Sequence, residues 1–197
     1  MAVAHAVPTP PPLQRPRVLL IGTAFAAAGV LTFFAVLLGI YLTRRAELIS
    51  AGDAWLPNDV TIPLQQPTMM LFTLVASCVT IQWAVYAVAR DDRRNTYLAL
   101  GISLIFGVAF INMASYLYTL MGLDITANQQ AVLIYTISIA HIIMLVGAMI
   151  YIGLMAVRAL GGQETSRQHD GVSAAALFWY ANVLVYFIIW LAIYVTK

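Results

Sequence analysis

Five long stretches without a charged residue dominate the pattern of hydrophobic and polar positions along this chain. They cover residues 18–42, 68–89, 96–120, 131–157 and 174–195, and each contains 22 residues or more. A helix rising about 1.5 Å per residue needs about 20 apolar residues to cross a hydrocarbon core of about 30 Å. The pattern therefore predicts an all-α, polytopic membrane protein, a bundle of five transmembrane helices.

The composition supports this prediction and leaves little room for a second globular domain. Hydrophobic residues make up 62% of the 197-residue chain and charged residues 9%, whereas soluble domains carry about 25% charged residues. We expect a Pro-rich, flexible cytoplasmic tail over residues 1–16 and a transmembrane helical bundle over residues 17–197. Because the first stretch is longer than the apolar part of a secretory signal peptide, we expect it to be a retained span.

The Lys and Arg residues are divided unevenly between the two ends of the expected helices. One end carries seven and the opposite end three: Arg15, Arg17, Arg90, Arg93, Arg94, Arg158 and Arg167 against Arg44, Arg45 and Lys197. Because basic residues collect on the cytoplasmic side, we expect the N-terminus in the cytoplasm and the C-terminus outside. The net charge of +2 is too small to indicate a nucleic-acid partner.

Few polar side chains lie within the five stretches. Hydrocarbon offers them no hydrogen-bond partner, so we expect them to face other helices. The predicted internal contacts of the bundle are Gln82, Asn112, Ser115, His141 and Asn182. A proton or ion path is the alternative interpretation. Such paths use charged side chains within the membrane. His141 is the one embedded group that titrates near neutrality, and a single imidazole does not make a relay.

The sequence contains no pattern typical of a catalytic or metal site. Cys78 is the single cysteine, and no pair of His or Cys residues has the spacing of metal ligands. We therefore expect no catalytic residue, cofactor or metal in this chain, and a subunit of a larger assembly rather than an enzyme. A free-standing transporter is the alternative; it predicts internal repeats or charges at mid-depth, and the sequence shows neither.

Short motifs follow one another through the second to fifth stretches. In chain order they are a Pro-rich approach from Leu56-Pro57 to Gln66-Pro67, Ser77-Cys78-Val79-Thr80-Ile81-Gln82, Gly107 and Phe110 followed by Asn112 and Ser115-Tyr116, His141 six residues before Gly147, and Phe178-Trp179 through to Ile193-Tyr194. Their order and spacing resemble subunit III of the haem-copper (cytochrome c) oxidases in its five-span bacterial form. The resemblance covers the chain from Trp55 onward and indicates a diverged member.

The chain departs from that family at its ionisable positions. Arg90 stands where the family has a carboxylate near the end of the second helix, and Ser115 stands where it has a Glu before Tyr. Met144 replaces the second His of the fourth-helix motif, and Tyr180 and Val183 replace a His and an Asp of the last helix. In the family, those charged groups are associated with lipid contact and proton uptake. Because this chain lacks them, these roles cannot be assigned to it.

The resemblance implies a non-catalytic, subunit III-like component of a membrane respiratory terminal oxidase, a cytochrome c or quinol oxidase. Such a component stabilises the catalytic subunit and holds phospholipid in a helical cleft. Haem and copper are then expected in the partner subunits I and II, which reduce oxygen and pump protons. The implied location is the bacterial plasma (inner) membrane.

Two further expectations follow from the resemblance. Arg90, Arg93 and Arg94 are candidate contacts for anionic lipid head groups, although the same arginines also serve simply to orient the chain. The alternative partner is another membrane complex, such as a nitric oxide reductase or a copper-dependent complex, and the lost carboxylates favour that alternative.

Overall fold

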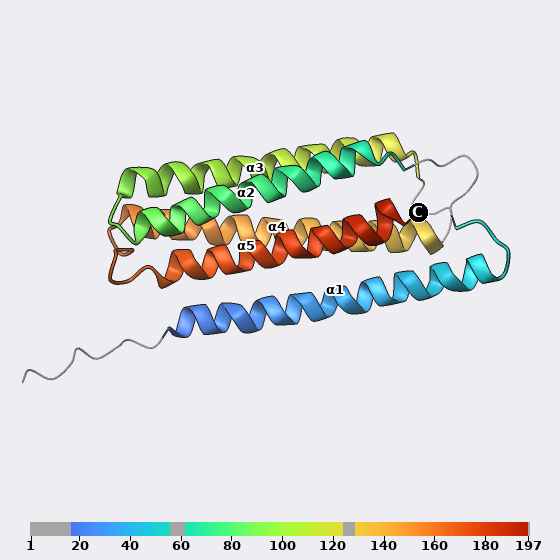
Figure 1. The fold of residues 1–197 in the computed structure, drawn as a ribbon, viewed down its shortest axis with the longest axis horizontal. Coiled ribbons are helices and arrows are strands. Elements are labelled where there is room, and N and C mark those ends of the chain that lie inside the picture. Colours follow the sequence, from blue (N-terminus) through green and yellow to red (C-terminus); the bar gives the residue numbers. More distant parts are fainter. Residues whose placement is uncertain (1–16, 56–61, 124–128, 197) are drawn as a thin grey trace, which may run out of the picture.

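The computed structural model describes residues 17–55, 62–123 and 129–196 and places almost all of them in helices. The helices are α1 (Val18–Ser50), α2 (Gln65–Val88), α3 (Arg93–Met121), α4 (Gln129–Leu160) and α5 (Asp170–Ile189), and a π-helix, η1 (Trp190–Val195), continues α5 directly (Figure 1). Five helices, the last running from Asp170 through Val195, are long and apolar enough to cross a membrane. The predicted all-α fold with five membrane-spanning helices is confirmed. The expected tail 1–16 and residues 56–61 of the Pro-rich approach lie outside the described residues.

The ends of the helices differ from those of the uncharged stretches. A helix can continue beyond the hydrocarbon until it reaches a terminating or capping residue. α1 runs through Arg44 and Arg45 to Ser50, and Gly52 adopts a left-handed backbone (φ +85°) just after its end. α3 begins where the Asp92 carboxylate accepts a hydrogen bond from the Asn95 backbone N–H (3.1 Å). These charged and polar ends add turns that lie beyond the apolar window.

Helices α2 to α5 form a four-helix bundle, and α1 lies along one side of it (Figure 1). α2 packs against α3 and α5, and α4 packs against the same two helices, whereas α1 packs mainly against α5 and less against α4. α5 is accordingly the most buried of the five and α1 the least. Polar contacts tie α1 to the bundle along its length: the Thr23 and Tyr151 hydroxyls lie 3.0 Å apart, and Arg45 donates to the Thr196 hydroxyl (2.8 Å). Arg17, directly before α1, lies 3.7 Å from the Asp170 carboxylate.

The π-helix η1 continues the burial of the last span. A π-turn is wider than an α-turn and is often found at functional sites. In η1 the consecutive residues Ala192, Ile193 and Tyr194 are all buried, as are several consecutive residues of α5. Tyr194 belongs to the interior of the bundle.

Candidate functional site

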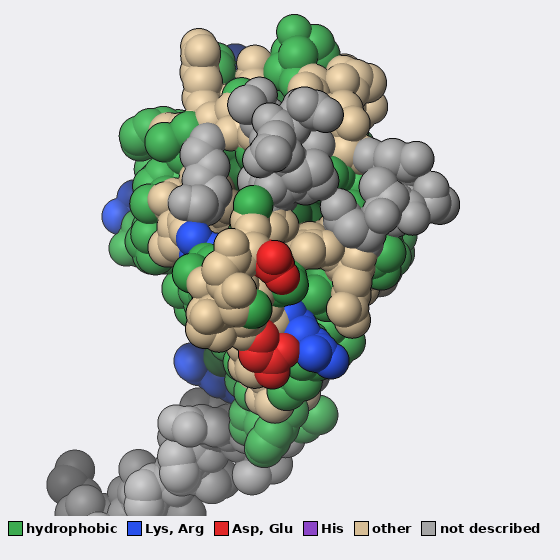
Figure 2. All heavy atoms as spheres, turned by 90° about the vertical axis from the view of Figure 1, so that its right-hand side faces the viewer, with side chains coloured by type: hydrophobic (Ala, Val, Ile, Leu, Met, Phe, Trp, Pro, Cys, Tyr) green, Lys and Arg blue, Asp and Glu red, His purple; other side chains and the backbone are tan. Residues whose placement is uncertain are grey.

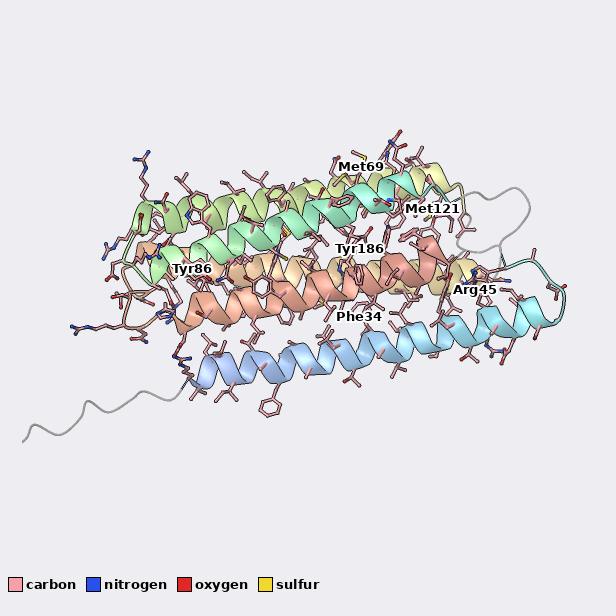
Figure 3. The ribbon with its side chains drawn as sticks, in the orientation of Figure 1. Phe34, Arg45, Met69, Tyr86, Met121 and Tyr186 are labelled. Atoms are coloured by element: carbon pink, nitrogen blue, oxygen red, sulfur yellow. The ribbon has the colours of Figure 1, made fainter. Side chains whose placement is uncertain are left out.

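His141 lies at the point where four helices meet. Its ring, from α4, packs edge-on against Phe110 of α3 (5.4 Å between centroids) and Phe34 of α1 (6.3 Å), and tilted against Tyr186 of α5 (5.2 Å). Figure 3 shows Phe34 reaching from α1 toward α5, which carries Tyr186. The imidazole Nε2 lies 3.2 Å from the backbone oxygen of Asn182. A carbonyl oxygen only accepts, so Nε2 carries the proton and the ring is held in one orientation.

This environment favours a structural imidazole over a proton relay. The ring is 2% exposed, its neighbours are aromatic, and a chain of proton donors needs further titratable groups. Within residues 17–55, 62–123 and 129–196 no three His, Cys, Asp or Glu side chains lie together as metal ligands do. His141 therefore connects α4 to α5 and to the aromatic core.

A small cavity lies beside His141. Its volume is about 10 Å³, which is roughly the room needed for one water molecule, so it is too small for an organic cofactor. Ser138, Tyr118 and Tyr194 all line this cavity, and the buried Ser138 hydroxyl has no hydrogen-bond partner among the described residues. A cavity of this size beside an unpaired hydroxyl suits one water molecule.

Asn182 is fully buried, as its predicted internal position requires. Its backbone oxygen accepts from His141, but its side-chain amide has no hydrogen-bond partner in the part of the chain that the structure describes. An amide left in this state destabilises a folded protein. The contribution of Asn182 to the helix contacts therefore comes from its backbone.

Gln82 of α2 lies at the contact with α5 and is half-buried. Its side-chain oxygen accepts a hydrogen bond from the Tyr180 hydroxyl (2.6 Å). One and a half turns earlier on α2, Ser77 accepts from the indole N–H of Trp179 (2.8 Å) and donates to the backbone oxygen of Leu74 (2.5 Å). Two neutral hydrogen bonds thus join the same pair of helices.

Two hydrogen bonds of α2 were not predicted from the sequence: the Trp179–Ser77 bond, and the link between the hydroxyls of Thr80 and Ser103 (2.7 Å), which joins α2 to α3. A signal was present, because Ser77, Thr80 and Gln82 belong to one short motif of α2. The structure shows that this motif distributes its polar groups between α3 and α5.

The internal position predicted for Asn112 and Ser115 is wrong. Both side chains are exposed on the outer face of α3, together with Tyr116, which is 53% exposed. The three residues do share one face, as their spacing predicts, but Phe110, Ala114 and Leu117 occupy the buried side of the helix. Larger apolar side chains fill the space between α3 and its neighbours, and the polar stripe points away from the bundle.

The arginines of the α2–α3 turn are exposed, at the end of the molecule where α4 ends and α5 begins. Beside Arg90, the Asp91 carboxylate accepts a hydrogen bond from the Ser166 backbone N–H (2.7 Å), which joins this turn to the α4–α5 loop. Hydrogen bonds from the Ser166 hydroxyl and backbone lower the pKa of Asp91. Arg93 and Arg94, like Arg90, remain available to ligands outside the chain.

Glu164 is a buried carboxylate in the α4–α5 loop. It lies 3.5 Å from Arg158 and also interacts with the backbone N–H groups of Gly171 and Val172 at the start of α5. Burial raises the pKa of Glu164, and Arg158 opposes that shift. A Cβ at Gly171 would contact the Glu164 carboxylate and would lie 2.6 Å from the sulfur of Met155, so a larger residue there requires the ends of those two side chains to shift.

Two surface grooves follow the first half of α4. The first has a volume of about 440 Å³ and an almost wholly apolar lining on α4: Val132, Tyr135, Thr136, Ile139, Ala140 and Ile143. The second has a volume of about 220 Å³ and lies at the end of α4 nearest the end of α1; it is lined by Arg44, Glu47, Leu48, Trp55, Gln129, Gln130 and Leu133. Figure 2 shows charged side chains of both signs at this end of the molecule. An apolar groove next to one that also carries charged and amide side chains suits an amphipathic ligand.

Comparison with known proteins adds an independent line of evidence. A family model described as cytochrome c oxidase subunit III matches residues 18–197. Proteins named cytochrome c oxidase subunit 3 are similar over 172 residues, or 86% of this chain: those of Loxodonta africana at 27% identity, Sus scrofa at 25% and Chondrus crispus at 22%. The chain spans 66%, 66% and 63% of the length of these relatives, respectively.

Proposed function

The chain belongs to the cytochrome c oxidase subunit III family, and from this membership we propose that it is a non-catalytic component of a membrane respiratory terminal oxidase. The observation that carries the proposal is the family match, which extends over all five spans. In this proposal a cytochrome c or quinol oxidase contains this chain beside subunits I and II, and those partners hold the haem and copper.

The interior of the bundle supports a stabilising role. Its polar contacts are neutral hydrogen bonds between helices, such as Trp179 to Ser77 and Tyr180 to Gln82. Bonds of this kind fix the positions of helices relative to one another. A rigid bundle of this type presents constant outer faces to a neighbouring subunit and to lipid.

Phospholipid binding is the second part of the proposal. The apolar groove along α4 suits an acyl chain, and Arg44 with the glutamines of the adjoining groove suits a head group. At the opposite end, Arg90, Arg93 and Arg94 are exposed and suit anionic head groups at a cytoplasmic surface. The uneven division of Lys and Arg supports this orientation. The five spans and the family support a multi-pass membrane protein, and the bacterial inner membrane is the location that the proposal assigns to it.

The lipid contacts are tested by comparing Arg90→Ala with the native chain. Both are purified in mild detergent, and the bound phospholipid is quantified by mass spectrometry. We expect less anionic phospholipid in the variant, because a basic residue near an anionic surface contributes about 1 kcal/mol. Arg167→Ala, which removes another exposed arginine of the same end, controls for a general change in charge. Unchanged phospholipid in Arg90→Ala would contradict the assignment.

Purification of the assembly tests the main proposal. An affinity tag on this chain, mild detergent, mass spectrometry of the recovered proteins and a reduced-minus-oxidised spectrum identify the partner. We expect a haem-bearing multispan subunit and oxygen consumption by the recovered complex. Recovery of the chain without any partner would contradict the proposal.

A second candidate partner is a nitric oxide reductase or a copper-dependent membrane complex. The observation that favours it is the replacement of family carboxylates, with Arg90, Ser115 and Val183 at those positions. The same purification distinguishes the two candidates. A complex that reduces nitric oxide, or one that contains copper without haem, would support the second candidate and exclude a terminal oxidase.

A further inference from the structure

We propose that the outer face of α3 around Asn112 is the surface on which a membrane-spanning helix of the partner subunit docks, with a hydrogen-bonding side chain opposite Asn112. The Asn112 face consists of Asn112, Ser115, Tyr116 and Thr119. These residues stand at positions i, i+3, i+4 and i+7 of α3 and are all exposed. They therefore form one continuous polar stripe, about 10 Å long.

The depth of Asn112 makes this exposure exceptional. Asn112 lies five residues from Gly107, the middle of α3 (Arg93–Met121), which corresponds to about 7.5 Å along the helix axis. The hydrocarbon core extends about 15 Å to either side of the bilayer centre. The amide is thus well inside the hydrocarbon, whereas Tyr116, about one turn further along, approaches the interface where tyrosines are common.

The Asn112 amide also lacks an internal partner. The Thr119 hydroxyl donates to the backbone oxygen of Tyr116 (2.7 Å), so a hydroxyl on this face can be satisfied by its own helix. No hydrogen bond of the Asn112 side chain occurs within residues 17–55, 62–123 and 129–196. An amide carries two donors and an acceptor, and acyl chains offer no partner to any of them.

The other outward faces of the bundle differ in chemistry. The exposed positions of α1 and α4 at similar depth are predominantly large apolar side chains: Phe25, Phe33, Val36, Ile139, Ile143 and Ile150. Thr32, an exposed polar residue of α1, donates to the backbone oxygen of Ala28 (2.9 Å). These faces suit lipid, whereas the Asn112 face complements a helix that carries an amide, hydroxyl or imidazole group.

The identity of the partner rests on the proposed function, which supplies a haem-bearing multispan subunit. A lipid head group is excluded as the occupant because it lies at the membrane surface and does not reach the depth of Asn112. A second copy of this chain is the remaining competitor. It would place the Asn112 faces of two copies against each other, and the experiment separates this arrangement from the proposed one.

A photocrosslinking experiment on the assembled complex tests the docking face. A benzophenone amino acid replaces Val108, which is 59% exposed one turn from Asn112 on α3, or Ile143, which is 68% exposed on α4. We expect irradiation of native membranes to join the probe at 108 to the haem-bearing subunit and the probe at 143 to no protein. Crosslinking to that subunit from 143 alone, or from 108 only to a second copy of this chain, would overturn the proposal.

Substitution of Asn112 gives a second measurement. Asn112→Leu should reduce the amount of haem-bearing subunit that co-purifies after a graded detergent wash by about threefold to tenfold, as expected for one interhelical hydrogen bond. Asn112→Gln keeps the amide and should retain the partner. Thr32→Val is the matched control on α1 and should leave recovery unchanged. Equal recovery with Asn112→Leu and the native chain would contradict the proposal.

The two proposals fail in different ways. If the probe at 108 joins this chain to a haem-free partner, the docking face stands and the terminal oxidase assignment falls. If a haem-bearing subunit co-purifies but crosslinks only from 143, the assignment stands and the docking face falls.

Discussion

The hydrogen bond between Trp179 and Ser77 should be a measurable link between α5 and α2. The indole N–H donates over 2.8 Å, and both side chains are fully buried. Hydrogen bonds between membrane helices contribute about 0.6 kcal/mol on average and about 1.7 kcal/mol at most in double-mutant cycles. For a short bond in a closed interior we expect a coupling free energy of about 1 kcal/mol.

The two single substitutions should cost more than the bond itself. Trp179→Phe also removes part of a large buried ring, so we expect a loss of about 2–3 kcal/mol in the free energy of unfolding. Ser77→Ala leaves the indole N–H of Trp179 buried without a partner, which costs about 1–2 kcal/mol. The double variant should then be about 1 kcal/mol more stable than the sum of the two single losses predicts.

Unfolding in mixed micelles with increasing SDS, with proteolysis of the unfolded fraction as the readout, measures these values. Trp83→Phe is the matched control, because Trp83 is an exposed tryptophan of α2 with 39% of its surface accessible; its loss should stay within about 0.5 kcal/mol. A coupling free energy within about 0.3 kcal/mol of zero would refute the argument, since it would mean that the two sites act independently.

Three further predictions concern the loops at the end where α4 meets α5. Gly171→Ala should lower the melting temperature in detergent, at a cost of about 1–3 kcal/mol in the free energy of unfolding, because its Cβ would contact Glu164. Gly161→Ala is the control, since a Cβ there has only ordinary contacts. Equal melting temperatures of the two variants would contradict the packing argument. Burial raises the pKa of Glu164 above 4.5, so the stability linked to this group is full below pH 4.5 and is lost as the pH rises through the raised pKa. Glu164→Gln should remove that decline in a pH series of melting temperatures. An unchanged slope in the variant would contradict the linkage to Glu164. Hydrogen bonds from Ser166 lower the pKa of Asp91 below 3.8, so its contribution is present above pH 3.8 and is lost as the pH falls through the lowered pKa. Asp91→Asn should remove this acid-side dependence, and Asp91→Ala should destabilise further because φ at this residue is +56°; thermal unfolding of the two variants at neutral pH and at pH 3 checks the order.

The five helices and the family could be predicted because both depend on properties that one sequence displays. An uncharged stretch of at least 22 residues has few alternatives to a transmembrane helix. The spacing of Ser77, Thr80 and Gln82, and the distance from His141 to Gly147, preserved enough of the family's order for the resemblance to appear. The family match over residues 18–197 confirms that resemblance.

Whether each polar side chain points into the bundle or outward could not be predicted in the same way. Helices that are apolar on nearly every side give no periodic signal of which face is inside. Under the general expectation that polar groups in a membrane protein point inward, His141, Asn182 and Asn112 look equivalent. The structure separates them, because His141 and Asn182 are buried and Asn112 is exposed. The π-helix was missed for a related reason: no residue in Trp190–Val195 marks a departure from α-helical geometry.

The peripheral position of α1 has a consequence for biosynthesis. The hydrogen bonds that attach it to the bundle pair Thr23 with Tyr151 and Arg45 with Thr196, across sequence separations of 128 and 151 residues. Of the five helices, α1 enters the membrane before the other four, yet its principal packing partner, α5, is made after them. Until then the ribosome holds a nascent chain in which α1 contacts lipid on nearly every side. Chains that terminate early within α5 would keep that span detached, and membrane quality-control proteases would meet a loose single helix beside an otherwise assembled bundle.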